Sequence, residues 1–181
     1  MTGRARRRLQ AGVLLGGALL TAGPRRAEGV EVNAGVNVGG IVAGIRPRLA
    51  VSPHLGASWG TPSGWLLTIQ DTPSILPAVN AHGPGVYNHL SVVAGFGWTD
   101  YNIALGPALS LYSMPACSPS LCSRVVGIAI GGYAQVDAYL AARFGLSATV
   151  NVDWIGGNSV VLPGNLLITA AAGPIVRWGA R

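Results

Sequence analysis

The chain has 181 residues, of which 50% are hydrophobic and 10% are charged, and glycine occupies 27 positions. Because soluble domains carry about 25% charged residues, this composition argues against an ordinary soluble protein. It also excludes intrinsic disorder, which combines low hydrophobicity with high net charge. The formal net charge of +6 would suit a nucleic-acid partner only if it were spread along the chain.

Half of the basic residues lie near the N-terminus, whereas all six acidic residues follow Ala27. The N-terminal group consists of Arg4, Arg6, Arg7, Arg8, Arg25 and Arg26. Beyond Ala27 the six remaining arginines balance the six acids. A neutral chain has no electrostatic reason to bind DNA, RNA or another acidic polymer, so we expect no nucleic-acid partner.

The N-terminal segment has the pattern of an export signal. A basic stretch, Arg4 to Arg8, precedes an apolar run from Ala11 to Ala22 and then small residues, as in secretory signal peptides. The run is shorter than the roughly 20 residues that a spanning helix needs, which disfavours the alternative of a membrane anchor. We predict that residues 1–27 are a signal peptide and that residues 28–181 form a single domain.

After residue 27, apolar residues alternate with small or polar ones, which is typical of strands with one apolar face. In Phe144–Trp154 every even position is apolar and every odd position is small or polar. The same pattern predicts eight strands. They are Val30–Ala43, Arg48–Trp59, Trp65–Asp71, Val86–Trp98, Tyr101–Ser113, Tyr133–Leu140, Phe144–Trp154 and Leu166–Trp178.

The predicted connections alternate in length. Those near Thr61–Ser63, Thr99–Asp100 and Arg143 are short, and the first link, at Arg46–Pro47, is short as well. Those at Thr72–Gly85, Met114–Gly131 and Ile155–Asn165 are longer. Short turns at one end and longer loops at the other are typical of bacterial outer-membrane barrels.

Two kinds of barrel fit this alternation. A soluble, lipocalin-like barrel would turn its apolar face inward and show water a surface with about 25 to 35% charged residues. The polar face here is mostly Gly, Ser, Thr and Asn, with few charges. The charged residues and histidines assigned to this face are Glu31, Arg48, His54, His89, Asp137, Asp153 and Arg177. So few charges suit a barrel interior, where we expect these side chains to form a polar network.

Aromatic residues lie on the apolar face near the strand ends. They are Trp59, Trp65, Trp98, Tyr101, Phe144, Trp154 and Trp178. Such rings form the interfacial girdles of membrane barrels, because they settle at headgroup depth. The sequence therefore predicts an all-β fold, a closed eight-stranded antiparallel transmembrane β-barrel in contact with outer-membrane lipid.

In these features the chain resembles the small outer-membrane barrels of OmpA or OmpX architecture. The resemblance rests on the export signal, the eight alternating strands and the aromatic Trp178 near the C-terminus. The stretch from Asn151 to Gly157, which leads to Val161–Gly164, is also similar to barrel proteins of Gram-negative bacteria that have no assigned function. The resemblance implies location in the outer membrane.

Cys117 and Cys122 lie in one predicted polar loop with Pro119 between them. An exported protein can keep such a pair as a local disulfide, which we predict. A metal site would need further ligands, and no histidine is near in sequence, so free thiols or a metal are the weaker alternatives.

Chain direction predicts two ion pairs inside the barrel. The first strand and the last lie side by side in a closed barrel, which brings Glu31 and Arg177 to the same end. Asp153 is expected at the opposite end, with Arg48 as its partner. A buried charge without a partner is costly, so these pairs are expected to support closure.

The function prediction is a non-enzymatic outer-membrane protein with a filled lumen and a structural or loop-mediated role, without metal or cofactor. A lipid-modifying enzyme of the same architecture is the alternative. It would need a histidine and a serine together on the outward face, whereas His54 and His89 are predicted to point inward. A triad of either histidine with Asp137 and Ser52 or Ser91 is conceivable, but sequence spacing does not test it. The glycine-rich stretch at Gly35–Gly40 lacks the elements of a phosphate-binding loop.

Overall fold

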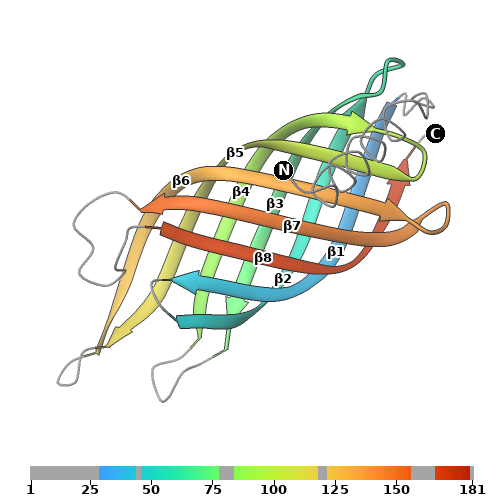
Figure 1. Ribbon diagram of the computed structural model, residues 1–181. Helices are drawn as coiled ribbons and strands as arrows, with labels where there is room; N and C mark the ends of the chain where they lie inside the picture. Colours follow the sequence, from blue (N-terminus) through green and yellow to red (C-terminus); the bar gives the residue numbers. More distant parts are fainter. Residues whose placement is uncertain (1–28, 44–45, 78–83, 118–121, 156–165, 180–181) are drawn as a thin grey trace, which may run out of the picture.

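The computed structural model describes residues 29–43, 46–77, 84–117, 122–155 and 166–179, which form a closed antiparallel β-barrel (Figure 1). The eight strands are β1 (Gly29–Ala43), β2 (Arg46–Gly60), β3 (Trp65–Leu76), β4 (Gly85–Gly97), β5 (Tyr101–Cys117), β6 (Cys122–Tyr139), β7 (Phe144–Ile155) and β8 (Leu166–Gly179). Each strand pairs with its neighbours in sequence, and β8 closes the barrel on β1. The predicted signal peptide lies outside the described residues. In the described part of the chain, no helix is long and apolar enough to span a membrane.

The two ends of the barrel differ in their connections. We call the end with the β2–β3, β4–β5 and β6–β7 connections the turn rim, and the opposite end the loop rim. The start of β1 and the end of β8 lie at the turn rim, at the upper right of Figure 1. The turn before β3 uses glycine, because Gly64 has a φ of 86° and its N–H donates to the carbonyl of Thr61 at 2.9 Å. Residues other than glycine rarely adopt a backbone conformation with a positive φ.

Strand register gives the barrel its stagger. Residue pairing followed from Asn33 through all eight strands returns to β1 at Ala43, ten residues further along. For eight strands, a stagger of ten residues corresponds to a strand tilt of about 40°, and each residue then rises about 2.5 Å along the barrel axis. This tilt is within the range of outer-membrane barrels.

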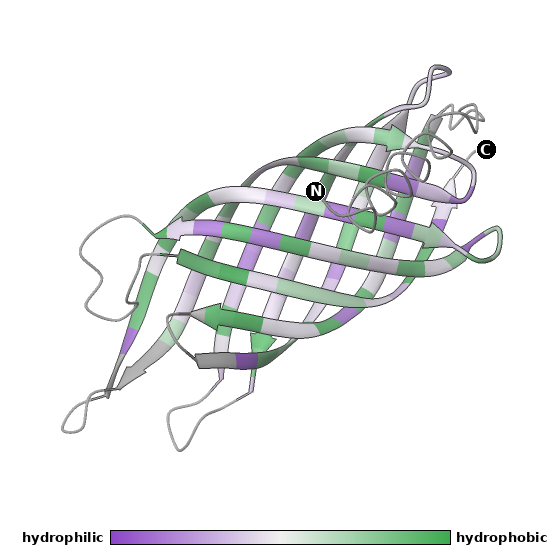
Figure 2. Ribbon diagram, in the orientation of Figure 1, coloured by the Kyte–Doolittle hydropathy of each residue, from purple (hydrophilic) through white to green (hydrophobic). Residues whose placement is uncertain are grey.

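The apolar face of each strand is on the outside. On β7, exposed and buried residues alternate along the whole strand, so that Val150 is 46% exposed and Asn151 is fully buried. Figure 2 shows the alternation as green and purple bands along the strands. The soluble, lipocalin-like alternative is therefore wrong, because it requires the apolar side chains inside.

Three predicted loops are shorter than expected. β3 continues beyond Asp71 to Leu76, and β4 begins at Gly85. β5 continues to Cys117 and β6 begins at Cys122, so the predicted Met114–Gly131 loop is mostly strand. β2 begins at Arg46, within the predicted first link. Of the long connections, the predicted Ile155–Asn165 loop matches the observed strand ends to within one residue, and the three short connections near Thr61–Ser63, Thr99–Asp100 and Arg143 match as well.

β5 and β6 form a hairpin that extends beyond the neighbouring strands at the loop rim. The last residue of β5 that pairs with β4 is Ser113, and the first of β6 that pairs with β7 is Ala129. From Met114 to Cys117 and from Cys122 to Ile128 the two strands pair only with each other (Figure 1). We call these residues the β5–β6 extension.

The lumen is polar over most of its length but apolar beneath this extension. The buried side chains there form one cluster, the apolar plug. It consists of Ile41, Ala50, Leu76, Tyr87, Tyr112, Met114, Ala129, Ile155 and Leu167. The plug was missed in the sequence because several of its residues fall in segments assigned to loops. The alternation of Ser110, Tyr112 and Met114 would have identified the inward face there.

Candidate functional site: the lumen, its two ends and the membrane-facing surface

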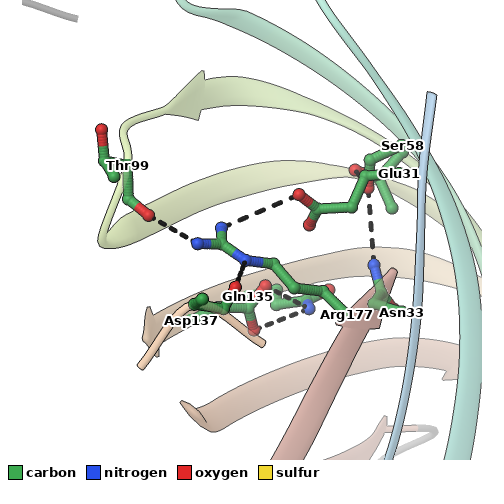
Figure 3. A network of polar contacts seen from close by, with 9 residues as sticks. Glu31, Asn33, Ser58, Thr99, Gln135, Asp137 and Arg177 are labelled. Carbon is green, nitrogen blue, oxygen red and sulfur yellow. Dashed lines mark hydrogen bonds and ion pairs between the residues drawn. The ribbon is translucent and has the colours of Figure 1, made fainter. Parts of the chain in front are cut away.

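Arg177 on β8 occupies the lumen at the turn rim (Figure 3). Its guanidinium lies 3.7 Å from the carboxylate of Glu31 and stacks over the ring of Tyr139 at 3.6 Å. It also donates hydrogen bonds to the backbone carbonyls of Thr99, at 2.7 Å, and Ala142, at 3.1 Å. One side chain therefore connects β1, β6 and β8 with the turns after β4 and β6.

The Glu31–Arg177 ion pair agrees with the expectation from strand order. Register places Arg177 opposite Asn33, two residues from Glu31 and on the same inward face. The contacts of Arg177 with the two carbonyls and with Tyr139 were not anticipated. No residue pattern near Arg177 indicates which backbone carbonyls of distant turns its guanidinium will reach.

Asp137 lies deeper in the lumen and is almost completely buried. Its two carboxylate oxygens accept hydrogen bonds from the side-chain amide of Gln135 at 2.8 and 3.0 Å. Further along the lumen, the amide of Gln70 donates to the hydroxyl of Tyr133 at 2.7 Å and to that of Thr72 at 3.2 Å. The centre of the lumen is thus filled by hydrogen-bonded side chains.

Asp153 on β7 is held by neutral partners. It accepts hydrogen bonds from the hydroxyl of Ser110 at 2.6 Å and from the amide of Asn151 at 2.7 Å. Asn151 donates also to the hydroxyl of Tyr87 at 2.6 Å. The expected ion pair between Asp153 and Arg48 is wrong. Arg48 lies on β2, which β1 and β8 separate from β7, and the ten-residue stagger directs Asp153 toward β5 instead.

Both described histidines point into the lumen. His54 and His89 are 4% and 2% exposed. The ring of His89 lies between those of Tyr87 and Tyr133, with centroids 5.3 and 5.4 Å away. The ring of His54 lies over Gly35, where an added Cβ would come within 2.5 Å of Cε1 of His54. Glycine at this position therefore makes room for the imidazole.

Neither histidine forms part of a triad. Within the described residues, no ring nitrogen of His54 or His89 has a hydrogen-bond partner. The two candidate serines are engaged elsewhere, since the Ser52 hydroxyl is 2.7 Å from that of Ser74 and the Ser91 hydroxyl donates to the carbonyl of Gln70. Nucleophilic catalysis requires a base within hydrogen-bond reach, and this arrangement lacks one.

No metal site is formed by the residues that the structure describes, because no three His, Cys, Asp or Glu side chains there are grouped closely enough to hold an ion.

The predicted girdle residues all project outward. The exposed fractions of Trp59, Trp65, Tyr101, Phe144, Trp154 and Trp178 range from 42% to 63%, and Trp98, just after β4, is half-buried. All except Trp154 lie at the turn rim, where Phe96 adds a further ring 4.5 Å from that of Trp65. The girdle is therefore concentrated at one interface, a distribution that the sequence analysis did not specify.

Cys117 and Cys122 are opposite each other in the strand register, at the end of the β5–β6 extension. The sequence analysis placed them in a loop, whereas they end two paired strands. Directly opposed residues of antiparallel strands have Cα atoms about 4.5 to 5.5 Å apart, within the range that a disulfide spans. The backbone therefore suits the predicted bond.

We expect Cys117 and Cys122 to be disulfide-bonded in the exported protein. The closed loop is short, so the chain-entropy model gives a stabilisation of only about 2 kcal/mol. Labelling intact cells with a maleimide should modify neither cysteine until a reductant is added. Ready labelling of both without reductant would show that the bond is absent.

No protein-family model and no curated protein sequence matches this chain. Solved structures do match. Neisserial surface protein A aligns with a TM-score of 0.55 and 16% identity, over 82% of this chain and 95% of its own. The N-terminal β-barrel domain of OprF from Pseudomonas aeruginosa aligns with a TM-score of 0.54 and 12% identity, over 83% and 98%.

Ail, the attachment invasion locus protein of Yersinia pestis, aligns with a TM-score of 0.53 and 14% identity, over 83% of this chain and 99% of its own. At these identities the likeness concerns the fold. It agrees with the eight paired strands, the apolar exterior and the aromatic girdle. The chain therefore has the fold of the small outer-membrane proteins, a closed eight-stranded antiparallel transmembrane β-barrel.

Proposed function

We propose that this protein is a non-enzymatic component of the outer membrane whose lumen is closed and whose specific role is exerted by the β5–β6 extension at the cell surface. The observation that carries the proposal is the contrast between the lumen, filled at both ends, and a hairpin that extends beyond every neighbouring strand.

The contents of the lumen argue against a diffusion pore. Arg177 spans the turn rim, and the apolar plug fills the other end, where Ile41, Ile155 and Leu167 are fully buried. Eight-stranded barrels have an interior just wide enough for side chains to fill. A role in transport of solutes through the lumen would require both ends to rearrange.

The extension is attached to the body of the barrel by specific contacts. The guanidinium of Arg124 donates to the hydroxyl of Ser113 and to the backbone carbonyl of Pro84, each at 2.8 Å. Tyr112 and Met114 at its base pack into the apolar plug. A hairpin held in a fixed orientation can present a preformed surface, which lowers the entropic cost of binding.

The names of two matched structures, a surface protein and an attachment invasion locus protein, fit a role at the cell surface. The likeness to them concerns the fold, so the proposed surface role rests on the β5–β6 extension of this chain.

We expect the purified protein to show no conductance above that of the bare lipid in planar bilayers. Replacing Arg177 by alanine removes the side chain that spans the turn rim, but the apolar plug should keep the lumen closed. Steady conductance of the wild-type protein would contradict the closed lumen.

The role of the extension is tested by complementing a deletion strain. One variant replaces residues 113–126 by a two-residue Asn-Gly turn, and a matched variant exchanges Ser52 and Ser74 for alanine in the lumen. Both should reach the outer membrane and migrate as heat-modifiable barrels. The phenotype of the deletion should persist only with the shortened hairpin. Rescue by the shortened hairpin together with failure of the lumen variant would assign the role to the lumen.

A further inference from the structure

A polar pair lies on the membrane-facing surface of β3 and β4. Asp71 is exposed there, and its Oδ1 accepts a hydrogen bond from Nδ2 of Asn88 at 2.9 Å. Apart from Ser113 and Arg124 of the hairpin and the aromatic residues, the other outward-facing strand residues whose side chains the structure describes are Gly, Ala, Val, Leu, Ile and Pro. The pair is therefore an isolated polar site on an apolar wall.

The depth of the pair places it among acyl chains. Asp71 follows Trp65 of the girdle by six residues, which corresponds to roughly 15 Å along the axis at about 2.5 Å per residue. The apolar band of such barrels is about 25 Å tall, so the backbone of Asp71 lies about 10 Å below its outer edge, and that of Asn88, eight residues from Phe96 of the girdle, lies about 5 Å below it. A polar residue on the lipid face at this depth is unfavourable and marks a functional position.

The adjoining strand pair adds a second, independent feature. Pairing between β2 and β3 stops after Leu55–Asp71 and resumes only at Val51–Ile75. Pro53 and Pro73 lie opposite each other in this gap, and Pro73 also pairs with Asn88 in the register of β3 and β4. Neither proline has an N–H to donate, so this part of the wall has more hydrogen-bond acceptors than donors.

The same imbalance holds for the side chains. A carboxylate only accepts hydrogen bonds and has about four acceptor sites, of which the amide of Asn88 uses one. Oδ1 of Asn88 also has no hydrogen-bond partner in the described structure, but this atom is buried, so the acceptors that a ligand can reach are those of Asp71. The site thus lacks donors, and a ligand that fits it must supply them within the acyl-chain region.

We propose that Asp71 and Asn88 form a binding site for an outer-leaflet lipid that carries hydroxyl or amide donors a few carbons below its headgroup. Such a lipid places the donor at the outer end of the pair, where the Asp71 carboxylate meets Asn88, and its acyl chains along Leu55 and Leu90, the outward residues opposite Asp71. A second copy of this chain fits less well, because it would add a second carboxylate and further acceptors.

The test compares vesicles that differ only in one donor group. Wild-type protein and the Asp71→Leu variant are folded into dimyristoyl phosphatidylcholine and into its analogue with 3-hydroxymyristoyl chains, and the folding equilibrium is measured by urea titration. In the plain lipid, Asp71→Leu should raise the equilibrium constant for folding by roughly fivefold relative to the wild-type protein, because the substitution removes a carboxylate from the hydrocarbon region. In the hydroxylated lipid this advantage should disappear.

Val150→Ala, a change at an outward apolar residue of β7 that follows Phe144 of the girdle by six residues, as Asp71 follows Trp65, serves as the matched control and should respond equally to both lipids. Asn88→Leu should reproduce the lipid dependence of Asp71→Leu, which keeps the test informative if one variant folds poorly. An equal advantage of Asp71→Leu in both lipids would overturn the proposal. The proposal would also be overturned if the wild-type protein formed a cross-linked dimer in both lipids and Asp71→Leu abolished that dimer. The occupant of the site would then be a second copy of the chain. Neither result bears on the proposed role of the hairpin.

Discussion

Replacing Val150 by arginine is expected to destabilise the barrel by about 2–4 kcal/mol in a bilayer. Val150 faces outward on β7 and follows Phe144 of the girdle by six residues, so it lies near the middle of the apolar band. A guanidinium there has neither water nor a counter-ion. The free energy of unfolding is measured by urea titration in phosphatidylcholine vesicles, with retention of the heat-modifiable band as evidence that the variant folds.

The matched control is Leu140→Arg. Leu140 follows β6 in a short turn and is 80% exposed, so an arginine there reaches the interface, where the cost is about 0–1 kcal/mol. Equal costs at the two positions would mean that Val150 does not face the acyl chains, and the orientation of β7 would have to be reversed.

The second large effect is expected at the turn rim. Arg177→Met removes an ion pair, two hydrogen bonds to backbone carbonyls and the stacking on Tyr139 at once. Loss of one member of a buried ion pair costs about 3–5 kcal/mol, and we expect the lower end because Glu31 is less buried than Arg177. Glu31→Gln should cost less, since Arg177 keeps its hydrogen bonds to the carbonyls of Thr99 and Ala142.

A double-mutant cycle separates the ion pair from the other contacts. The variant with both Glu31→Leu and Arg177→Met should be more stable than the sum of the single effects predicts, by about 1 kcal/mol, because no carboxylate is left beside the missing guanidinium. Strict additivity in detergent or vesicles would show that Arg177 acts through the carbonyls and Tyr139 alone.

Contacts across the lumen depended on how the strands are staggered. The Glu31–Arg177 pair follows from the adjacency of the first and last strands, so chain direction predicts it. The partner of Asp153 does not follow in this way. A ten-residue stagger around eight strands displaces side chains that a simple side-by-side arrangement would bring together, and Asp153 meets Ser110 rather than Arg48. The residue pattern of a single strand does not indicate this stagger, because the stagger depends on how all eight strands pair.

The sequence did not predict the depth of Asp71 in the membrane, for a related reason. The sequence pattern ended the strand at this residue, which would have made the carboxylate a rim group, whereas β3 continues to Leu76. Residues that break the alternation, such as Asp71, Pro73 and Asn88, weaken the signal at the positions where the membrane-facing surface is unusual. Pairing between β3 and β4 keeps all three residues in strands despite their local character.

The sequence by itself determined that the chain forms a barrel and which face of it is apolar. Alternation of period two and terminal aromatics are local features, and for β7 they specify the orientation of every residue. Only the tertiary structure decided how the lumen is closed, that the β5–β6 extension projects from the rim, and that Asp71 lies among acyl chains. These features arise from contacts between residues far apart in the chain, whose geometry is fixed when strand number, tilt and stagger are combined in a closed barrel.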